Sequence, residues 1–270
     1  MNGNAASNTH DTVTSVAQHA ALLSLLLLVC LFPFPLLAAS PERISVAYSI
    51  DSIPFQYTDE SGEPNGIIID YWKLWSAKTG IAVDFTEAPW NQTLALARDG
   101  EVDAHAGLFF NEERDRFLDY GVALTKTDTN IFFHNSVGVP DDVRQLSAYR
   151  IGVLGKDFVE GYLKERVEPD SVVGFPDYSE IMEKLQSGEL KVFAADTPTG
   201  LFHLAQAGLL AKFHYDHSAP LYRNDWLVAS GEGNAEMLEL INQGMALISP
   251  DERKRIERRW VSGTPGEASD

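Results

Sequence analysis

The protein has 270 residues, of which 39 are acidic and 21 are lysine or arginine, so its formal net charge is −18. A surface with this charge repels nucleic acid and anionic lipid headgroups. We therefore expect no nucleic-acid partner. The acidity favours solubility and says little about the chemistry of a ligand.

Residues 1–39 contain a long apolar run that predicts export. The run covers residues 20–39 and ends at the small residues Ala39 and Ser40, which is typical of a signal peptide and of a periplasmic protein. No Lys or Arg precedes the run, and about 20 apolar residues can also span a bilayer, so an uncleaved anchor is the alternative. The only cysteine, Cys30, lies within the run, so a cleaved chain has no disulfide.

From residue 43 onward, short β-like runs alternate with helical runs. Apolar residues from Ile68 to Trp75 recur at the i, i+3, i+4 and i+7 spacing of an amphipathic helix, and Gly80 ends this pattern. The other elements predicted in the first part are strands at 44–48, 81–85 and 102–107 and a helix at 90–98.

A second set of alternating elements follows. Its predicted strands are 150–154, 191–195 and 225–229, and its helices are 158–167, 178–185, one from 197 and two at the end of the chain. The last helix has a defined start, because Ser249 can serve as N-cap, Pro250 can occupy the first helical position and Glu252 can complete a capping box.

This alternation predicts an α/β fold with parallel β-α-β units. Two such sets without a linker indicate two lobes that share a hinge. Open α/β sheets bind ligands beyond the carboxyl ends of their strands, so the cleft between the lobes is the expected ligand site.

Seven short segments between residues 43 and 261 carry a family resemblance through their order and spacing. They are Ile53-Pro54-Phe55, Asn65-Gly66-Ile67-Ile68-Ile69-Asp70, Pro89-Trp90, Gly100-Glu101-Val102-Asp103-Ala104, Glu113-Arg114 with Phe117-Leu118-Asp119-Tyr120, Ala195-Asp196-Thr197-Pro198, and Glu252-Arg253 with Ile256 and Arg259-Trp260. Together they resemble the bacterial extracellular solute-binding proteins of family 3, whose best-known members bind polar amino acids in the periplasm.

The resemblance implies a monomeric, two-lobed fold of the type II periplasmic-binding class, in which each lobe is an open sheet flanked by helices. Lobe 1 would combine residues 41–124 with 225–270, because the last helices must return to it, and lobe 2 would comprise residues 129–219. A hinge of two segments, near 124–128 and 220–225, would join them and allow closure around a ligand.

The resemblance also implies binding roles for individual residues. Arg114 would hold the ligand's carboxylate through its planar guanidinium, and Asp196, on the other lobe, would receive the ammonium group. The backbone of Ala106 and Gly107 would add polar contacts. Taken alone, Arg114 reads as a surface ion-pair residue and Asp196 as a helix N-cap.

Tyr48, Phe55 and Trp90 would form apolar or stacking walls, although Trp90 alone reads as a core residue.

Two single positions and one turn depart from the family pattern. Phe109 stands where amino-acid binders usually carry a hydroxyl, and Ser49 stands where some have an acidic residue. Residues 155–158 (Gly-Lys-Asp-Phe) replace a turn rich in glycine and hydroxyl groups. Lys156 either places a positive charge beside an anionic ligand or is simply exposed to solvent. These changes make the pocket more aromatic and favour an aromatic or larger amino acid, or another carboxylate.

The function we expect is capture of an amino acid or a related carboxylate for the membrane permease of an ABC importer. No enzymatic motif, cofactor motif or metal site is expected, although His214 and His217 lie close in sequence. A dehydratase-like enzyme is a weaker alternative.

The main alternative is the input module of a signalling kinase or a cyclic-dinucleotide enzyme, which the second half of the chain resembles equally well. We expect a free receptor, because no second hydrophobic span or signalling domain follows Trp260 in this sequence.

Overall fold

The computed structural model describes residues 41–140 and 142–262, which belong to one compact unit. The predicted export segment lies outside the described residues. Among the residues described, no helix is both long enough and apolar enough to cross a membrane.

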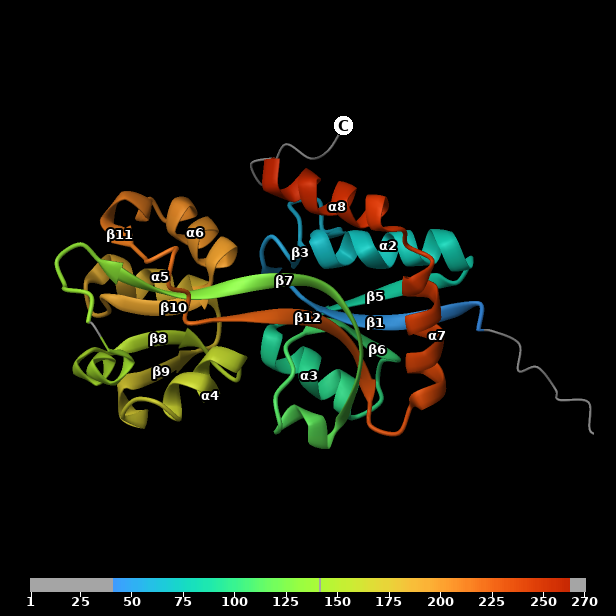
Figure 1. The fold of residues 1–270 in the computed structure, drawn as a ribbon, viewed down its shortest axis with the longest axis horizontal. Helices are drawn as coiled ribbons and strands as arrows, with labels where there is room; N and C mark the ends of the chain where they lie inside the picture. Colours follow the sequence, from blue (N-terminus) through green and yellow to red (C-terminus); the bar gives the residue numbers. More distant parts are fainter. Residues whose placement is uncertain (1–40, 141, 263–270) are drawn as a thin grey trace, which may run out of the picture. The chain divides into compact units, whose positions relative to one another are not determined.

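Nine of the described strands form one hydrogen-bonded sheet (Figure 1). In spatial order they are β5 (Ala82–Ala88), β1 (Arg43–Ser49), β6 (Ala104–Leu108), β12 (Tyr222–Gly231), β7 (Leu118–His134), β10 (Val192–Asp196), β8 (Ile151–Leu154) and β9 (Val172–Phe175), and β11 (Phe213–His214) pairs with β7. β2 (Asp51–Ser52), β3 (Gln56–Thr58) and β4 (Pro64–Asn65) form a separate small sheet.

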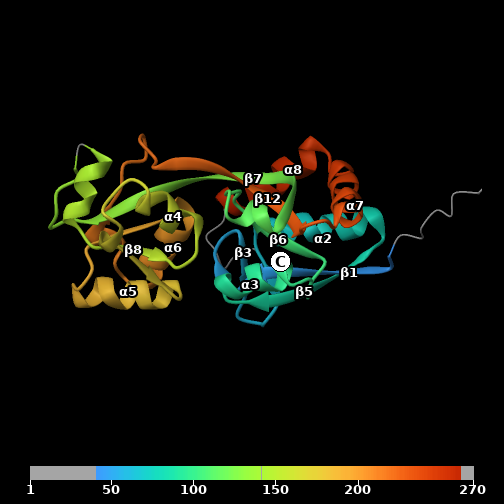
Figure 2. The same cartoon turned by 90° about the horizontal axis from the view of Figure 1, so that it is seen from below.

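The pair β7 and β12 connects the two predicted α/β sets. These strands run antiparallel side by side in both views (Figures 1 and 2), from the pair Tyr222–Thr129 to the pair Gly231–Leu118. On one side of the pair, β5, β1 and β6 are parallel to one another; on the other side, β10, β8 and β9 are parallel. The two segments predicted to cross between the lobes, 124–128 and 220–225, fall within β7 and at the start of β12. The boundaries of the two lobes remain a prediction.

Helices cover both parallel groups of strands, as expected for β-α-β units. They are α2 (Ile67–Thr79), α3 (Trp90–Arg98), α4 (Phe158–Lys164), α5 (Tyr178–Ser187), α6 (Thr197–Gln206), α7 (Ala235–Ala246) and α8 (Pro250–Ser262). Short 3-10 helices occur at Arg114–Arg116, Val143–Ala148, Pro169–Ser171 and Leu210–Lys212. Both α7 and α8 contact α2, so the end of the chain returns to the first set of elements.

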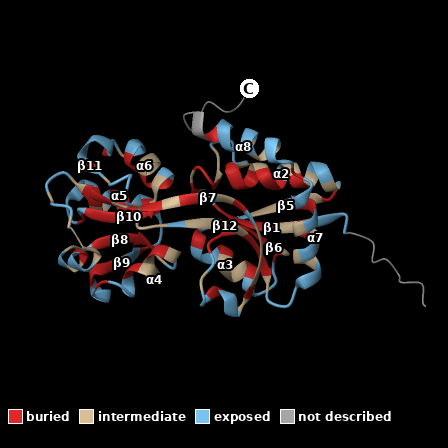
Figure 3. Ribbon diagram, in the orientation of Figure 1, coloured by how far each residue is buried: buried red, intermediate tan, exposed pale blue. Residues whose placement is uncertain are grey.

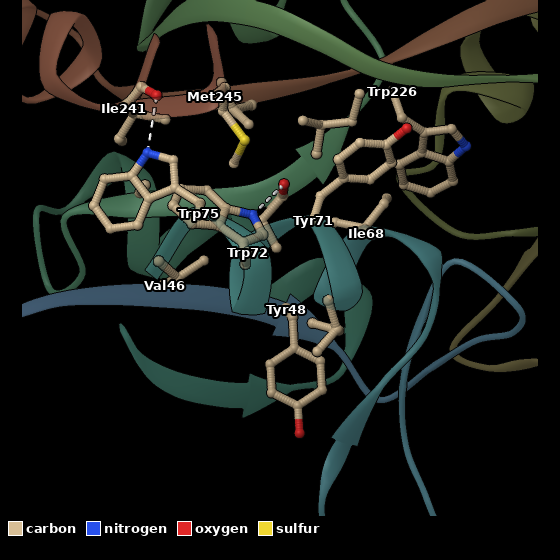
Figure 4. Packing of buried hydrophobic residues seen from close by; sticks show 14 of the residues in the cluster. Val46, Tyr48, Ile68, Tyr71, Trp72, Trp75, Trp226, Ile241 and Met245 are labelled. Carbon is tan, nitrogen blue, oxygen red and sulfur yellow. Dashed lines mark hydrogen bonds between the residues drawn. The ribbon is translucent and has the colours of Figure 1, made fainter. Parts of the chain in front are cut away.

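The core lies under these helices, and their outer faces are exposed (Figure 3). Two indoles of α2 are central to it: Trp72 Nε1 donates to Ala106 O over 2.9 Å, and Trp75 Nε1 donates to Ile241 O over 3.0 Å (Figure 4). Because both buried N–H groups have partners, α2 is held against β6 on one side and α7 on the other.

Candidate ligand-binding site

The carboxyl ends of β6, β8 and β10 and the starts of α3, α4 and α5 surround a small cavity. Its lining consists of Ser52, Trp90, Phe109, Leu154, Asp157, Tyr178, Asp196, Thr199 and Trp226. The cavity measures about 10 Å³, which is room for about one water molecule. Both α/β sets contribute to it, and it lies where open α/β folds bind ligands.

Asp196 ends β10 and lines the cavity. It occupies the N-cap position of α6, yet its side chain makes no capping hydrogen bond. Instead, Oδ1 accepts a 2.6 Å hydrogen bond from Thr129 Oγ1 on β7. Burial raises the pKa of Asp196 well above its usual value, the charge of Asp157 raises it further, and the hydrogen bond from Thr129 opposes this rise. The carboxylate is thus available to a group in the cavity.

Arg114 is buried, with an exposed fraction of 3%, so it is not a surface ion-pair residue. Its guanidinium joins the two α/β sets, because NH1 donates to Phe109 O over 2.9 Å and NH2 donates to Lys156 O over 3.1 Å. The guanidinium also lies over the Trp90 ring, 5.2 Å from the ring centroid. Arg114 is absent from the cavity lining, but its guanidinium lies beside Trp90 and Asp157, which both line the cavity.

Asp157 is the acidic group nearest to this arginine, with Oδ1 3.8 Å from Arg114 NH2. The same oxygen caps α4 by accepting from Phe158 N over 2.7 Å. Burial raises the pKa of Asp157, and the charge of Arg114 and the capping hydrogen bond partly offset this effect. Burial likewise lowers the pKa of Arg114, although a guanidinium stays charged. Asp157 is therefore an acidic partner, within the protein itself, for the arginine that was predicted to bind the ligand's carboxylate.

Trp90 starts α3 and is buried at the edge of the cavity. His105 contacts Trp90 directly and through Thr93. The His105 ring lies edge-on to the indole, with the ring centroids 5.7 Å apart. Its Nε2 lies 2.9 Å from Thr93 Oγ1, which in turn donates to Trp90 O. Because Nδ1 accepts from Gly107 N, Nε2 carries the hydrogen. Burial and the charge of Arg114 lower the pKa of His105 to about 3, so the ring is neutral.

A group of aromatic side chains closes the cavity from the side of the connecting strands. Trp226 on β12 stacks on Phe55 at 4.9 Å and meets Phe109 edge-on at 4.8 Å. Phe109 also contacts Phe158 of α4 at 6.0 Å. The indole N–H groups of Trp90 and Trp226 are buried without a hydrogen-bond partner among the described residues. A buried N–H group without an acceptor destabilises the folded protein, because it has lost its hydrogen bonds to water.

Four other predicted site residues have partners away from this cavity. The Tyr48 hydroxyl is 2.9 Å from Thr58 Oγ1, and Ser49 bonds Gln56 and Asp51. The carbonyl oxygens of Ala106 and Gly107 accept from Trp72 and Gln56.

Lys156 is exposed, and its carbonyl oxygen accepts from Arg114. Of the predicted set, Trp90, Phe109 and Asp196 line the cavity, and Phe55 reaches it through Trp226.

The sequence interpretation did not name several lining residues, which are Ser52, Leu154, Asp157, Tyr178, Thr199 and Trp226. Asp157 could have been predicted from the sequence, because it lies in the turn that departs from the family pattern. Trp226 was also visible as the single tryptophan in the extended run 225–229.

A larger hollow of about 700 Å³ lies elsewhere, along residues 123–127 of β7 beside Phe55 and Trp260. Its lining contains neither Arg114 nor Asp196, so it is not the site that the sequence predicts.

Comparisons with known proteins agree with this architecture. The family model for bacterial extracellular solute-binding proteins, family 3, matches residues 44–263. A curated relative is the virulence sensor protein BvgS of Bordetella pertussis (strain Tohama I), which is 23% identical over 212 residues, or 77% of this chain. The chain spans 17% of that protein's length.

Two solved structures share the fold. A histidine kinase sensor domain with similarity to periplasmic binding proteins has a TM-score of 0.76 and 20% identity, with 82% of this chain and 96% of that chain covered. An ancestral arginine-binding protein bound to glutamine has a TM-score of 0.73 and 21% identity, with 83% and 100% covered.

The chain therefore belongs to the bacterial extracellular solute-binding proteins, family 3. Its fold is the type II periplasmic-binding fold, as the sequence predicted. The family is extracytoplasmic, and it includes both amino-acid-binding proteins and sensor domains.

Proposed function

We propose that this chain is a periplasmic receptor that captures a small solute with an ammonium group, an amino acid being the first candidate, without converting it chemically. The observation that carries the proposal is the position of Asp196. Its carboxylate ends a β-strand, lines a cavity formed by both α/β sets, and is held by Thr129 rather than by the helix it precedes.

Arg114 supports the amino-acid candidate. It is buried beside Trp90 and bonds carbonyl groups of both α/β sets, so a ligand carboxylate near it would draw the two sets together. In this proposal Asp196 takes the ammonium group and binding is coupled to closure; if the ligand is an amino acid, Arg114 takes its carboxylate.

A thermal-shift screen of the purified protein against amino acids, amines and carboxylates tests this proposal. A ligand at 100 times its Kd stabilises the folded state by about 2.7 kcal/mol, which raises the Tm of a chain of this size by about 5–10 °C. Small-angle scattering with the best compound should show a smaller radius of gyration. A screen without any stabilising compound contradicts the proposal.

Two variants then test the site with the best compound. Asp196→Asn should weaken binding by about 30-fold or more, and Arg114→Ala should do the same if the compound is an amino acid, because each change then leaves a charge of the ligand without its partner. Glu183→Gln, an exposed change on α5, serves as the control and should bind normally. Normal binding by both site variants would place the ligand elsewhere.

The captured solute is passed either to the permease of an ABC importer or to a sensor kinase. The similarity to BvgS and to a kinase sensor domain supports the second outcome as strongly as the arginine-binding protein supports the first. Uptake of a labelled ligand by cells with and without the gene separates the two, because a sensor leaves uptake unchanged and alters transcription.

A further inference from the structure

The charges around the cavity do not balance. Asp157 and Asp196 both line it, whereas the buried cation beside them is Arg114. The side chain of Lys156 is exposed and is not part of the lining. With both carboxylates ionised, the three groups carry one excess negative charge, which either a proton, favoured by the raised pKa values of Asp157 and Asp196, or a cationic ligand can neutralise.

A zwitterionic ligand does not correct this imbalance, because its own net charge is zero. Its carboxylate would also have to approach Arg114 beside Asp157, whose Oδ1 is already 3.8 Å from NH2. Two carboxylates near one guanidinium repel each other. A ligand with a net charge of +1 would restore neutrality.

The aromatic lining fits a cation that also carries an uncharged acceptor. Trp90, Phe109, Tyr178 and Trp226 all line the cavity, and aromatic faces attract ammonium groups. The indole N–H groups of Trp90 and Trp226 lack partners and are more than nine-tenths buried. A hydroxyl or carbonyl oxygen can accept from them without adding a negative charge.

We propose that this site, once the two α/β sets open around the small cavity, binds a small organic cation, with an ammonium group held by Asp196 and Asp157 and a neutral oxygen acceptor facing the two indoles, and that Asp157 excludes a free carboxylate. This inference rests on the proposed function and narrows its ligand class. Asp157 thereby becomes the specificity-determining residue, because it occupies the place beside Arg114 that an amino acid's carboxylate would take.

Amino acids and their primary amides test the inference, because each amide matches its acid in size and differs in charge. Calorimetric titration of the full chain at pH 7, where an α-amino group is mostly protonated, compares glycine, valine, phenylalanine and tyrosine with their amides. The best amide should bind at least about tenfold more tightly than its acid, as one net charge in a dry cavity is a large difference.

Asp157→Asn removes the charge and keeps an oxygen that can cap α4, so the fold is retained. In this variant the preference for the amide should fall at least about tenfold, because the carboxylate of the acid can then reach Arg114. Glu183→Gln removes one exposed acidic charge that is not part of the lining and should keep the parental ratio.

Three results would overturn the inference. Tighter or equal binding of the acid by the parent protein rejects the cation preference and leaves the proposed function standing. An unchanged ratio in Asp157→Asn rejects the role of Asp157. No binding of any acid or amide, by the parent or the variant, rejects both the inference and the proposed function.

Discussion

Thr129 donates its hydroxyl hydrogen to Asp196 Oδ1 over 2.6 Å, so a residue of the connecting strand β7 positions the carboxylate that lines the cavity. The bond joins residues 67 positions apart in the chain. This hydrogen bond therefore ties the position of the Asp196 carboxyl group to β7, one of the two strands that connect the α/β sets.

Asp196→Asn should stabilise the protein in the absence of ligand. The pKa of Asp196 is raised in the folded state, so folding binds a proton there and stability falls as pH rises from its unfolded pKa, about 3.9, through the raised value. Asparagine has no charge to bury and still accepts from Thr129. At pH 7 we expect a Tm increase of about 2 °C or more, corresponding to about 1 kcal/mol, and a flatter pH dependence.

Thermal melts of both proteins from pH 4 to pH 8 measure this effect. Glu183→Gln should leave the melting curve unchanged at every pH. A lower Tm for Asp196→Asn at pH 7 would mean that the carboxylate is stabilising in the folded state and contradict the prediction.

His105 should make the protein sensitive to mild acid. Its folded pKa is about 3, below the usual 6.5, so the unfolded chain binds the proton more readily and stability is lost as pH falls below about 6.5. Between pH 7 and pH 5 this loss is about 2 kcal/mol. His105→Gln should reduce the pH dependence in urea unfolding by about this amount, leaving the share of His203, whose pKa burial lowers to about 4, whereas exposed His217→Gln should not reduce it. Equal slopes for all three proteins would exclude His105 as the cause.

Two glycines in helices should respond oppositely to alanine. A Cβ at Gly244 of α7 would collide with Trp75 Nε1 and lie 2.7 Å from Thr79 Cγ2, whereas a Cβ at Gly161 of α4 meets nothing within 4 Å. Gly244→Ala should therefore cost about 1–3 kcal/mol in chemical unfolding. Gly161→Ala should gain up to about 1 kcal/mol through helix propensity. Stabilisation by both changes would show that α2 and α7 can separate to accommodate the methyl group.

Lys156 has a left-handed backbone conformation, with φ at 61°. Residues other than glycine adopt this conformation at a cost in free energy. Lys156→Gly should stabilise the protein by up to about 1 kcal/mol, and Lys156→Ala should not, because alanine keeps the strain. Differential scanning calorimetry measures both. Since the Lys156 side chain is exposed and does not line the cavity, both variants should bind ligand as the parent does. A parallel loss of binding would assign the lysine charge to the ligand.

Local sequence patterns predicted the helices with the clearest signals. The apolar spacing from Ile68 to Trp75 corresponds to α2, and α8 begins at Pro250 as the capping box required. In that box, Ser249 N donates to Glu252 over 2.9 Å and Glu252 N donates to Ser249 over 3.4 Å. These features depend on residues within a few positions of one another, so the sequence alone is sufficient.

The long strand β7 was not predicted, although it connects the two sets. Its middle, from Thr125 to Asn130, alternates threonines with charged or amide residues and lacks an apolar stripe. These residues are extended because they pair with β12, which lies about 95 positions away, as in the ion pair between Asp128 and Arg223. A partner that distant leaves no local pattern.

The sequence by itself determined the family, the α/β fold, and the importance of Asp196 and Arg114 as candidates, because ordered motifs and periodicity are properties of the chain. Only the tertiary structure decided that Asp157 lines the cavity beside Arg114, and that two indole N–H groups of the lining residues lack acceptors. The charge and polarity of a site depend on which strand ends meet, and that meeting is set by packing over the whole sheet rather than by neighbouring residues.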